Sequence, residues 1–336
     1  MQIYLIGGQA QSGAVLDETL AFDPVFETFN TSLARMLTPR YRFAAAAVET
    51  LIYVVGGVEV TDGAPLSSIH VYDTARDVWT PLAANMSQPR SDLAAAAYGG
   101  KVYVMGGYGV DYDMSITGSL TEVYDPVSGG WSVLAPMSAS RGDLVAITYG
   151  DRIFVMGGWN DALAAGGDFT AAVEAFSPRR GKWTTHANML VRKGDTAVAL
   201  YRNRIVTVGG ELWSGRSGPC PWDAALVCRI NQVPSHDTTS FAPDTEPATN
   251  PETADVGPNA AGSVAGVNGA PGVWVPHAPL PAARFRFAAA AHVESQAVFV
   301  FGGTQSQGRV SADVSAFYDT THPQVFVHYK EGTNAR

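Results

Sequence analysis

The sequence predicts an all-β propeller, a ring of similar small sheets around a common axis. Three observations lead to this prediction. A double glycine ends a β-branched or aromatic run six times, these runs recur about every 50 residues, and other landmarks keep the same spacing. A fixed period near 50 residues that carries four short strands is typical of a propeller blade.

The double glycines define the repeat. They follow the runs IYLI, IYVV, VYVM, IFVM, IVTV and VFVF. Their first members lie 49, 50, 51, 52 and 93 residues apart, and the last interval is one period plus an insertion. The six pairs are Gly7–Gly8, Gly56–Gly57, Gly106–Gly107, Gly157–Gly158, Gly209–Gly210 and Gly302–Gly303.

Each repeat reads as four strands in order. The first is a run of small residues such as FAAAAV, and the second is the run into the double glycine. The third ends at an aromatic-Asp corner such as VYDT, and the fourth carries a tryptophan, which we expect to pack between neighbouring sheets. Small side chains suit the first strand because blades narrow toward the axis. An arginine precedes each small-residue run, namely Arg40, Arg90, Arg141, Arg192 and Arg284.

These landmarks together resemble the Kelch-repeat family over almost the whole chain. The resemblance implies a single six-bladed β-propeller over residues 1–336, with four-stranded antiparallel blades. The units are about 1–39, 40–89, 90–140, 141–191, 192–283 and 284–336, with insertions 213–240 and 245–272 in the fifth. The first unit begins at its second strand, so we expect the first blade to lack its innermost strand.

Composition narrows the function. The formal net charge is −9, which argues against nucleic acid or an anionic membrane as a partner. No apolar run approaches the length of a membrane span, and no signal peptide is visible, so we expect a cytoplasmic location. Cys220 and Cys228 lie in one loop, where a local disulfide and two free thiols are both open.

One position of the repeat carries charge at the channel mouth. Alignment on the alanine runs brings Arg42, Asp92, Asp143, Asp195 and Arg286 to one equivalent place. They are either solvated turn residues or a ligand site. A mouth divided between acids and arginines suits a zwitterionic ligand or a peptide with both charges. Three converging carboxylates also suit a cation such as Ca²⁺.

The loops after the double glycines lie on the same face. They add polar and aromatic candidates, and the 213–240 insertion should fold over the mouth, with Cys220–Cys228 as a possible link. These candidate ligand-binding residues are Glu59, Tyr108, Trp159, Glu211, Trp213 and Gln305.

We therefore expect a non-catalytic propeller that binds a protein or other charged ligand at this mouth, without cofactor or metal. The alternative is a sugar mutarotase that resembles the N-acetylneuraminate epimerases, which are also six-bladed Kelch propellers. That resemblance implies an acid/base pair, and GGELWSGR offers Glu211 and Arg216. The spacing and flanking residues depart from that family.

Overall fold

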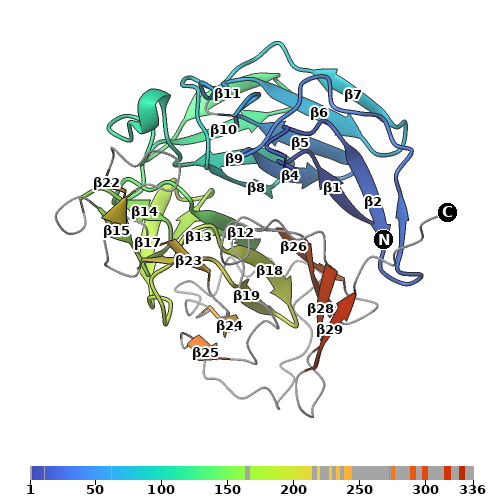
Figure 1. The fold of residues 1–336 in the computed structure, drawn as a ribbon. Helices are drawn as coiled ribbons and strands as arrows, with labels where there is room; N and C mark the ends of the chain where they lie inside the picture. The colour runs from blue at the N-terminus through green and yellow to red at the C-terminus, as the bar shows by residue number, and fades with distance from the viewer. Residues whose placement is uncertain are drawn as a thin grey trace, which may run out of the picture.

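The computed structural model forms a ring of antiparallel sheets (Figure 1). The structure describes residues 2–10, 12–61, 63–162, 167–213, 218–219, 227–228, 232–234, 238–243, 272, 274–276, 288–292, 297–301, 314–318 and 325–329. Strands with small side chains surround the axis, and the tryptophan strands lie at the periphery (Figure 1).

Five sheets have four strands each. Three of them follow directly along the chain. Their strands are β4 (Ala44–Val48), β5 (Leu51–Val55), β6 (Ile69–Asp73) and β7 (Val78–Pro81); β8 (Ala94–Tyr98), β9 (Lys101–Met105), β10 (Thr121–Asp125) and β11 (Gly130–Val133); and β12 (Val145–Tyr149), β13 (Arg152–Met156), β16 (Val173–Ser177) and β17 (Lys182–His186).

The other two four-stranded sheets belong to the last two repeats. Their strands are β18 (Ala197–Tyr201), β19 (Arg204–Val208), β24 (Thr238–Phe241) and β25 (Trp274–Pro276); and β26 (Ala288–His292), β27 (Ala297–Phe301), β28 (Val314–Tyr318) and β29 (Val325–Tyr329). In all five sheets the first strand pairs with the run into the double glycine, as in Ala44 opposite Val55.

The prediction was six blades, the first of them without its innermost strand, and the count is corrected to five four-stranded blades within the described residues. The first repeat forms a three-stranded sheet of β1 (Ile3–Ile6), β2 (Thr19–Asp23) and β3 (Thr28–Asn30). Within the described residues β1 pairs only with β2, so this sheet has no strand beside the axis. The sheet still packs against the last repeat, because Phe22 contacts Phe299 and Phe301 edge to face.

The core lies between neighbouring sheets. One cluster joins Tyr53 and Val55 to Val104 and Tyr124 of the next repeat. Each tryptophan of the outer strands donates its indole N–H to an alanine carbonyl of the preceding repeat, which confirms the predicted packing role. The pairs are Trp79 to Ala34, Trp131 to Ala84, Trp183 to Ala135 and Trp274 to Ala187, at 2.8–3.4 Å.

A buried cation precedes the inner strand in four successive repeats. Arg40, Arg90 and Arg141 are at most 1% exposed, and each donates to backbone carbonyls of its own repeat. In the fifth repeat Lys193 occupies this place, since its carbonyl accepts from Gly158 as the carbonyl of Arg141 accepts from Gly107. The sequence assignment of Arg192 is therefore wrong. Arg192 is exposed and pairs with Asp168 at 3.0 Å.

The loops after the double glycines contain short secondary-structure elements. They are the 3-10 helix η1 (Val110–Tyr112) and the two-stranded pairs β14 (Trp159–Asn160) with β15 (Asp168–Phe169), β20 (Glu211–Trp213) with β23 (Gln232–Pro234), and β21 (Gly218–Pro219) with β22 (Val227–Cys228). Within the described residues, no helix is long and apolar enough to cross a membrane.

Candidate functional site

Four successive repeats place one charged residue each at the channel mouth, two positions before the inner strand. Arg42, Asp92, Asp143 and Asp195 have φ of 57°, 50°, 55° and 45°, in the left-handed region. Aspartate tolerates this region better than most residues, because its short polar side chain bonds locally. Because the four residues share this backbone conformation, their Cα–Cβ bonds have similar orientations relative to the axis.

A series of three backbone hydrogen bonds sets the spacing of these residues. The amide of Asp92 donates to the carbonyl of Arg42 at 2.9 Å, Asp143 to Asp92 at 3.1 Å, and Asp195 to Asp143 at 2.9 Å. Because each bond joins neighbouring repeats, the residues follow one another around the mouth at the separation of the sheets. Residues about 50 positions apart in sequence therefore become direct neighbours.

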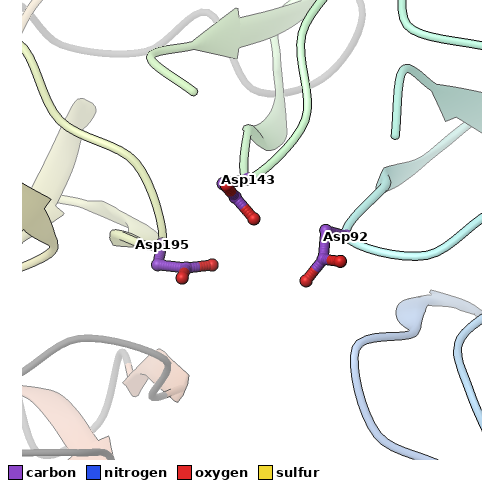
Figure 2. A group of neighbouring side chains, drawn as sticks. All are labelled: Asp92, Asp143 and Asp195. Atoms are coloured by element: carbon purple, nitrogen blue, oxygen red, sulfur yellow. The ribbon is translucent and has the colours of Figure 1, made fainter. Parts of the chain in front are cut away.

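The three carboxylates converge (Figure 2). One oxygen from each of Asp92, Asp143 and Asp195 lies within 4.8 Å of the others. They line a cavity of about 330 Å³ whose walls are the starts of β4, β8, β12 and β18, together with Ala289 of β26. The walls are mainly alanine, valine and leucine, so the acids are the main charge in this space. Three like charges this close repel one another, so a cation between them is favoured.

Arg42 forms an ion pair with Asp92 of the next repeat. Its Nε lies 3.3 Å from Oδ1 of Asp92, and the two side chains are only 17% and 5% exposed. Its Nη1 donates to the hydroxyl of Tyr112 at 3.1 Å, and its guanidinium lies 5.6 Å from that ring centre. The sequence predicts that Arg42 binds a carboxylate of the ligand. To do so, Arg42 would have to give up its contacts with Asp92 and Tyr112. The described mouth is mainly acidic.

Tyr108 supports Asp143 from the preceding repeat. It is 8% exposed, and its hydroxyl donates to Oδ2 of Asp143 at 2.7 Å. Burial, followed by the charges of Asp143, Asp92 and Asp195, raises the pKa of Tyr108 well above its usual range. The hydroxyl therefore stays a donor at any physiological pH and orients the Asp143 carboxylate.

Among the other predicted ligand residues, Glu59, Trp159 and Glu211 are described and do not line this cavity. Glu59 is exposed, and Trp159 donates its indole N–H to Asp161 at 2.7 Å and packs edge to face on Phe169. Glu211 is fully buried, so it does not open onto solvent as a rim residue would. Arg286, Gln305, Arg216 and Cys220 lie outside the described residues, as do the side chains of Trp213 and Cys228.

Sequence reasoning missed Tyr112, which covers Arg42 from the loop of the next repeat. Tyr112 follows Asp111 in η1, and both residues have positive φ, at 59° and 55°. Its ring also lies 5.7 Å from that of Tyr108. No repeat landmark marks this position, because η1 occurs in a loop whose length differs from one unit to the next.

The fold and the mouth define a repeat propeller with a charged axial opening, and the comparisons name its family. Residues 1–213 match the model of the KLHDC2/KLHL20/DRC7 Kelch-repeats domain. The chain therefore belongs to the Kelch-repeat family.

Its relatives include Kelch-like protein 36 of Bos taurus, 33% identical over 106 residues, which is 31% of this chain and 17% of that protein. Kelch-like protein 25 of Xenopus tropicalis is 27% identical over 210 residues, 62% of this chain and 27% of that protein. The matches thus cover less than a third of the relatives' length. A solved structure titled "Structure of YjhT" has the same fold, with a TM-score of 0.70, 14% identity, and coverage of 95% and 93% of the two chains.

Proposed function

We propose that this propeller is a non-catalytic binding protein whose mouth takes a lysine or arginine side chain of a partner protein segment. The convergence of Asp92, Asp143 and Asp195 on one cavity carries the proposal. Kelch-repeat proteins typically bind protein partners, which favours a polypeptide ligand.

The charge of the mouth favours a cationic group. Arg42 balances one of the three carboxylates, and a ligand cation would relieve the repulsion that remains. Asp92 is buried and Asp143 and Asp195 are half-buried, so the attraction is screened less than at a fully exposed surface. The prediction of a zwitterionic ligand rests on both Arg42 and Arg286. Arg42 pairs with Asp92, and Arg286 lies outside the described residues.

The shape of the mouth favours a side chain over a folded surface. The cavity is about 330 Å³, a volume that accommodates one long side chain but not a folded surface. Tyr108 holds one acid in place for it. Pre-orientation reduces the entropy lost on binding.

A peptide titration tests this proposal. The probe is acetyl-Gly-Gly-Lys-Gly-Gly-amide, followed by calorimetry or NMR at low and high salt. We expect binding that Asp143→Asn weakens at least tenfold and that 0.5 M salt weakens further. Asp151→Asn is the matched control, because Asp151 is exposed in the hairpin between β12 and β13, at the other end of the inner strand.

Two comparison ligands complete the design. The same peptide with acetylated lysine should not bind, since acetylation removes the charge. Equal binding of both peptides, or a wild-type affinity in Asp143→Asn, would contradict the proposal. CaCl₂ alone distinguishes a metal site: tight calcium binding that excludes the lysine peptide would assign the acids to a metal instead.

The alternative function, a sugar mutarotase, stays a prediction that can be tested directly. A general base must come within hydrogen-bond reach of its substrate, and Glu211 is fully buried, so the geometry supports this reading less well. Anomer exchange of N-acetylneuraminate, followed by NMR, decides it. Acceleration that Glu211→Gln abolishes would replace the binding proposal.

A further inference from the structure

The face opposite the channel mouth is formed by two kinds of turn. One joins each inner strand to the strand that follows it, and the other joins the third strand of a sheet to the fourth. Because neighbouring strands are antiparallel, both turns lie at the end of the sheet away from the mouth. In the second repeat, for example, Val48, Leu51, Asp73 and Val78 are successive partners across the four strands at this end. We call the surface made by these turns the turn face.

The turn face of the second repeat is acidic. Glu49 and Asp77 are exposed, and Asp73 lies partly exposed in the same turn as Asp77. Oδ1 of Asp73 accepts from the amides of Ala75 and Arg76 at 3.0 and 3.1 Å, which fixes the shape of that turn. Among residues 49–50 and 73–78, which the structure describes in full, Arg76 is the one base, and it pairs with Asp73 at 3.2 Å. An excess of negative charge therefore remains.

The turn face of the fourth repeat is basic. Arg179, Arg180 and Lys182 are exposed in and directly after the turn between β16 and β17. Arg152 adds a fourth base at the start of β13, in the turn that follows the inner strand. Among residues 150–152 and 177–182, which the structure describes in full, Asp151 is the one acid, and it lies 3.8 Å from Arg152. These turns therefore carry an excess of positive charge in a protein whose net charge is −9.

The third repeat lies between the second and the fourth around the ring (Figure 1), and its turns are neutral. Residues 99–101 and 125–130 contain one base and one acid, Lys101 and Asp125, whose charged groups lie 2.8 Å apart. Val127, at the tip of the turn between β10 and β11, is 97% exposed. Across three neighbouring repeats the turn face thus changes from acidic through neutral to basic.

We propose that the turn face binds the turn face of a second copy of this chain, in a dimer with two-fold symmetry. The symmetry axis runs across the face through the third repeat. Rotation about this axis exchanges the second and fourth repeats, so the acids of each copy meet the bases of the other. The third repeat meets its own equivalent, where like charges would repel. Its two charges are already paired with each other, and Val127 can contact Val127 of the second copy.

A second copy fits this face better than a partner of one charge, because an acidic partner that covered the face would be repelled by the second repeat. The two charged turns also have the same place in their sheets. Asp73 lies six residues before Trp79, and Ser177 lies six residues before Trp183. The turns are therefore at the same distance from the propeller axis and can meet when two faces come together. Charged contacts of this kind favour a weak association that salt opposes.

The channel mouth lies on the opposite face, so the dimer leaves it open. Two mouths would then point away from each other, and each could hold its own ligand. Dimerisation does not depend on what the mouth binds, because the two surfaces share none of the charged residues named here.

Analytical ultracentrifugation of the full chain, over a concentration series into the high micromolar range, tests the proposal. We expect a dimer in about 50 mM salt whose affinity falls at least tenfold in about 0.5 M salt. Arg179→Glu combined with Arg180→Glu should weaken the dimer at least tenfold. The control is Arg35→Glu combined with Arg192→Glu, which changes the net charge equally. Both control arginines are 62% exposed and pair with acids near the mouth, so this variant should dimerise as wild type does.

A charge exchange separates loss of pairing from damage to the fold. Glu49→Lys combined with Ala75→Lys makes the second repeat basic and should also prevent self-association. Mixed in equal amounts, this variant and the variant with Arg179→Glu and Arg180→Glu should form a heterodimer, because each contact again joins acids to bases. The measurement is repeated with Asp143→Asn, where dimerisation should persist even if lysine binding at the mouth is lost.

Three results would overturn the proposal. One is a monomeric wild type at every concentration in low salt, which would leave the basic turns to a different acidic molecule. Another is a dimer that Arg179→Glu with Arg180→Glu leaves unchanged, which would place the interface elsewhere. The third is the absence of a heterodimer in the mixture of the two charge-reversed variants.

Discussion

The hydroxyl of Tyr108 donates to Oδ2 of Asp143 at 2.7 Å, so a residue that follows one double glycine orients the acid of the next repeat. The contact crosses between two sheets and joins the loop before η1 to the channel mouth. It makes the charge arrangement depend on how the sheets pack.

Replacing Tyr108 with phenylalanine should change the alkaline stability. Because the folded-state pKa of Tyr108 is raised, the folded protein holds this proton more tightly than the unfolded chain, whose tyrosine pKa is about 10. The contribution is fully present below pH 10 and declines above it. At pH 11 wild type should therefore have lost about 1 kcal/mol more than Tyr108→Phe, relative to pH 9. Urea unfolding at both pH values measures this, and parallel curves would contradict it.

The buried pair of Arg90 and Glu122 should contribute strongly to stability. Both side chains are at most 1% exposed and hydrogen-bonded to each other. Glu122→Gln leaves a buried guanidinium without its counter-charge, and we expect a loss of roughly 3–5 kcal/mol in the free energy of unfolding. Lys101→Met breaks the exposed pair with Asp125 and should change stability little, which serves as the control. Similar losses in both variants would be inconsistent with this account.

His70 should make the protein sensitive to mild acid. It stands where two other repeats have Glu122 and Glu174, and its Nε2 lies 3.0 Å from Nη2 of Arg40. Burial, and then the charge of Arg40, lowers the pKa of His70 to about 4. The stability contribution is complete above pH 6.5 and is lost as pH falls toward 4, by about 3 kcal/mol in total.

The variant His70→Gln should lack this component. Thermal melts between pH 7 and 4 give the comparison, since carboxylates elsewhere titrate alike in both proteins. His70→Glu should stabilise the protein at pH 7, because it supplies Arg40 with the partner that the neighbouring repeats provide. A wild-type pH profile in His70→Gln would contradict the assignment.

Gly56 should tolerate no side chain. Its φ is +65°, and an added Cβ would come within 2.5 Å of the carbonyl oxygen of Arg90. We expect Gly56→Ala to cost roughly 3 kcal/mol or more, since strain and overpacking add. Gly99 has φ +57° with open space around it, so Gly99→Ala should cost only about 1 kcal/mol. Chemical denaturation of both variants would show the difference, and equal losses would rule out the close contact as its cause.

The repeat pattern predicted much of the fold. The double glycines, the alanine runs and the spaced tryptophans predicted a Kelch propeller of four-stranded sheets, which the structure and the family match confirm. These features are local and recur in each repeat. The repeat length can therefore be found from the sequence without knowledge of long-range contacts. The predicted six blades are corrected to five four-stranded blades, beside which the first repeat forms a three-stranded sheet within the described residues.

The sequence by itself determined the strand order, the small residues at the axis, and the alignment of Arg42 with three aspartates. Only the tertiary structure decided that Arg42 pairs with Asp92, that Lys193 rather than Arg192 is buried, and that Glu211 lies inside. These outcomes depend on contacts between repeats about 50 residues apart. The alternation of residues along a strand predicts which face of the sheet a side chain occupies. The contacts of that side chain depend on how neighbouring sheets pack around the ring.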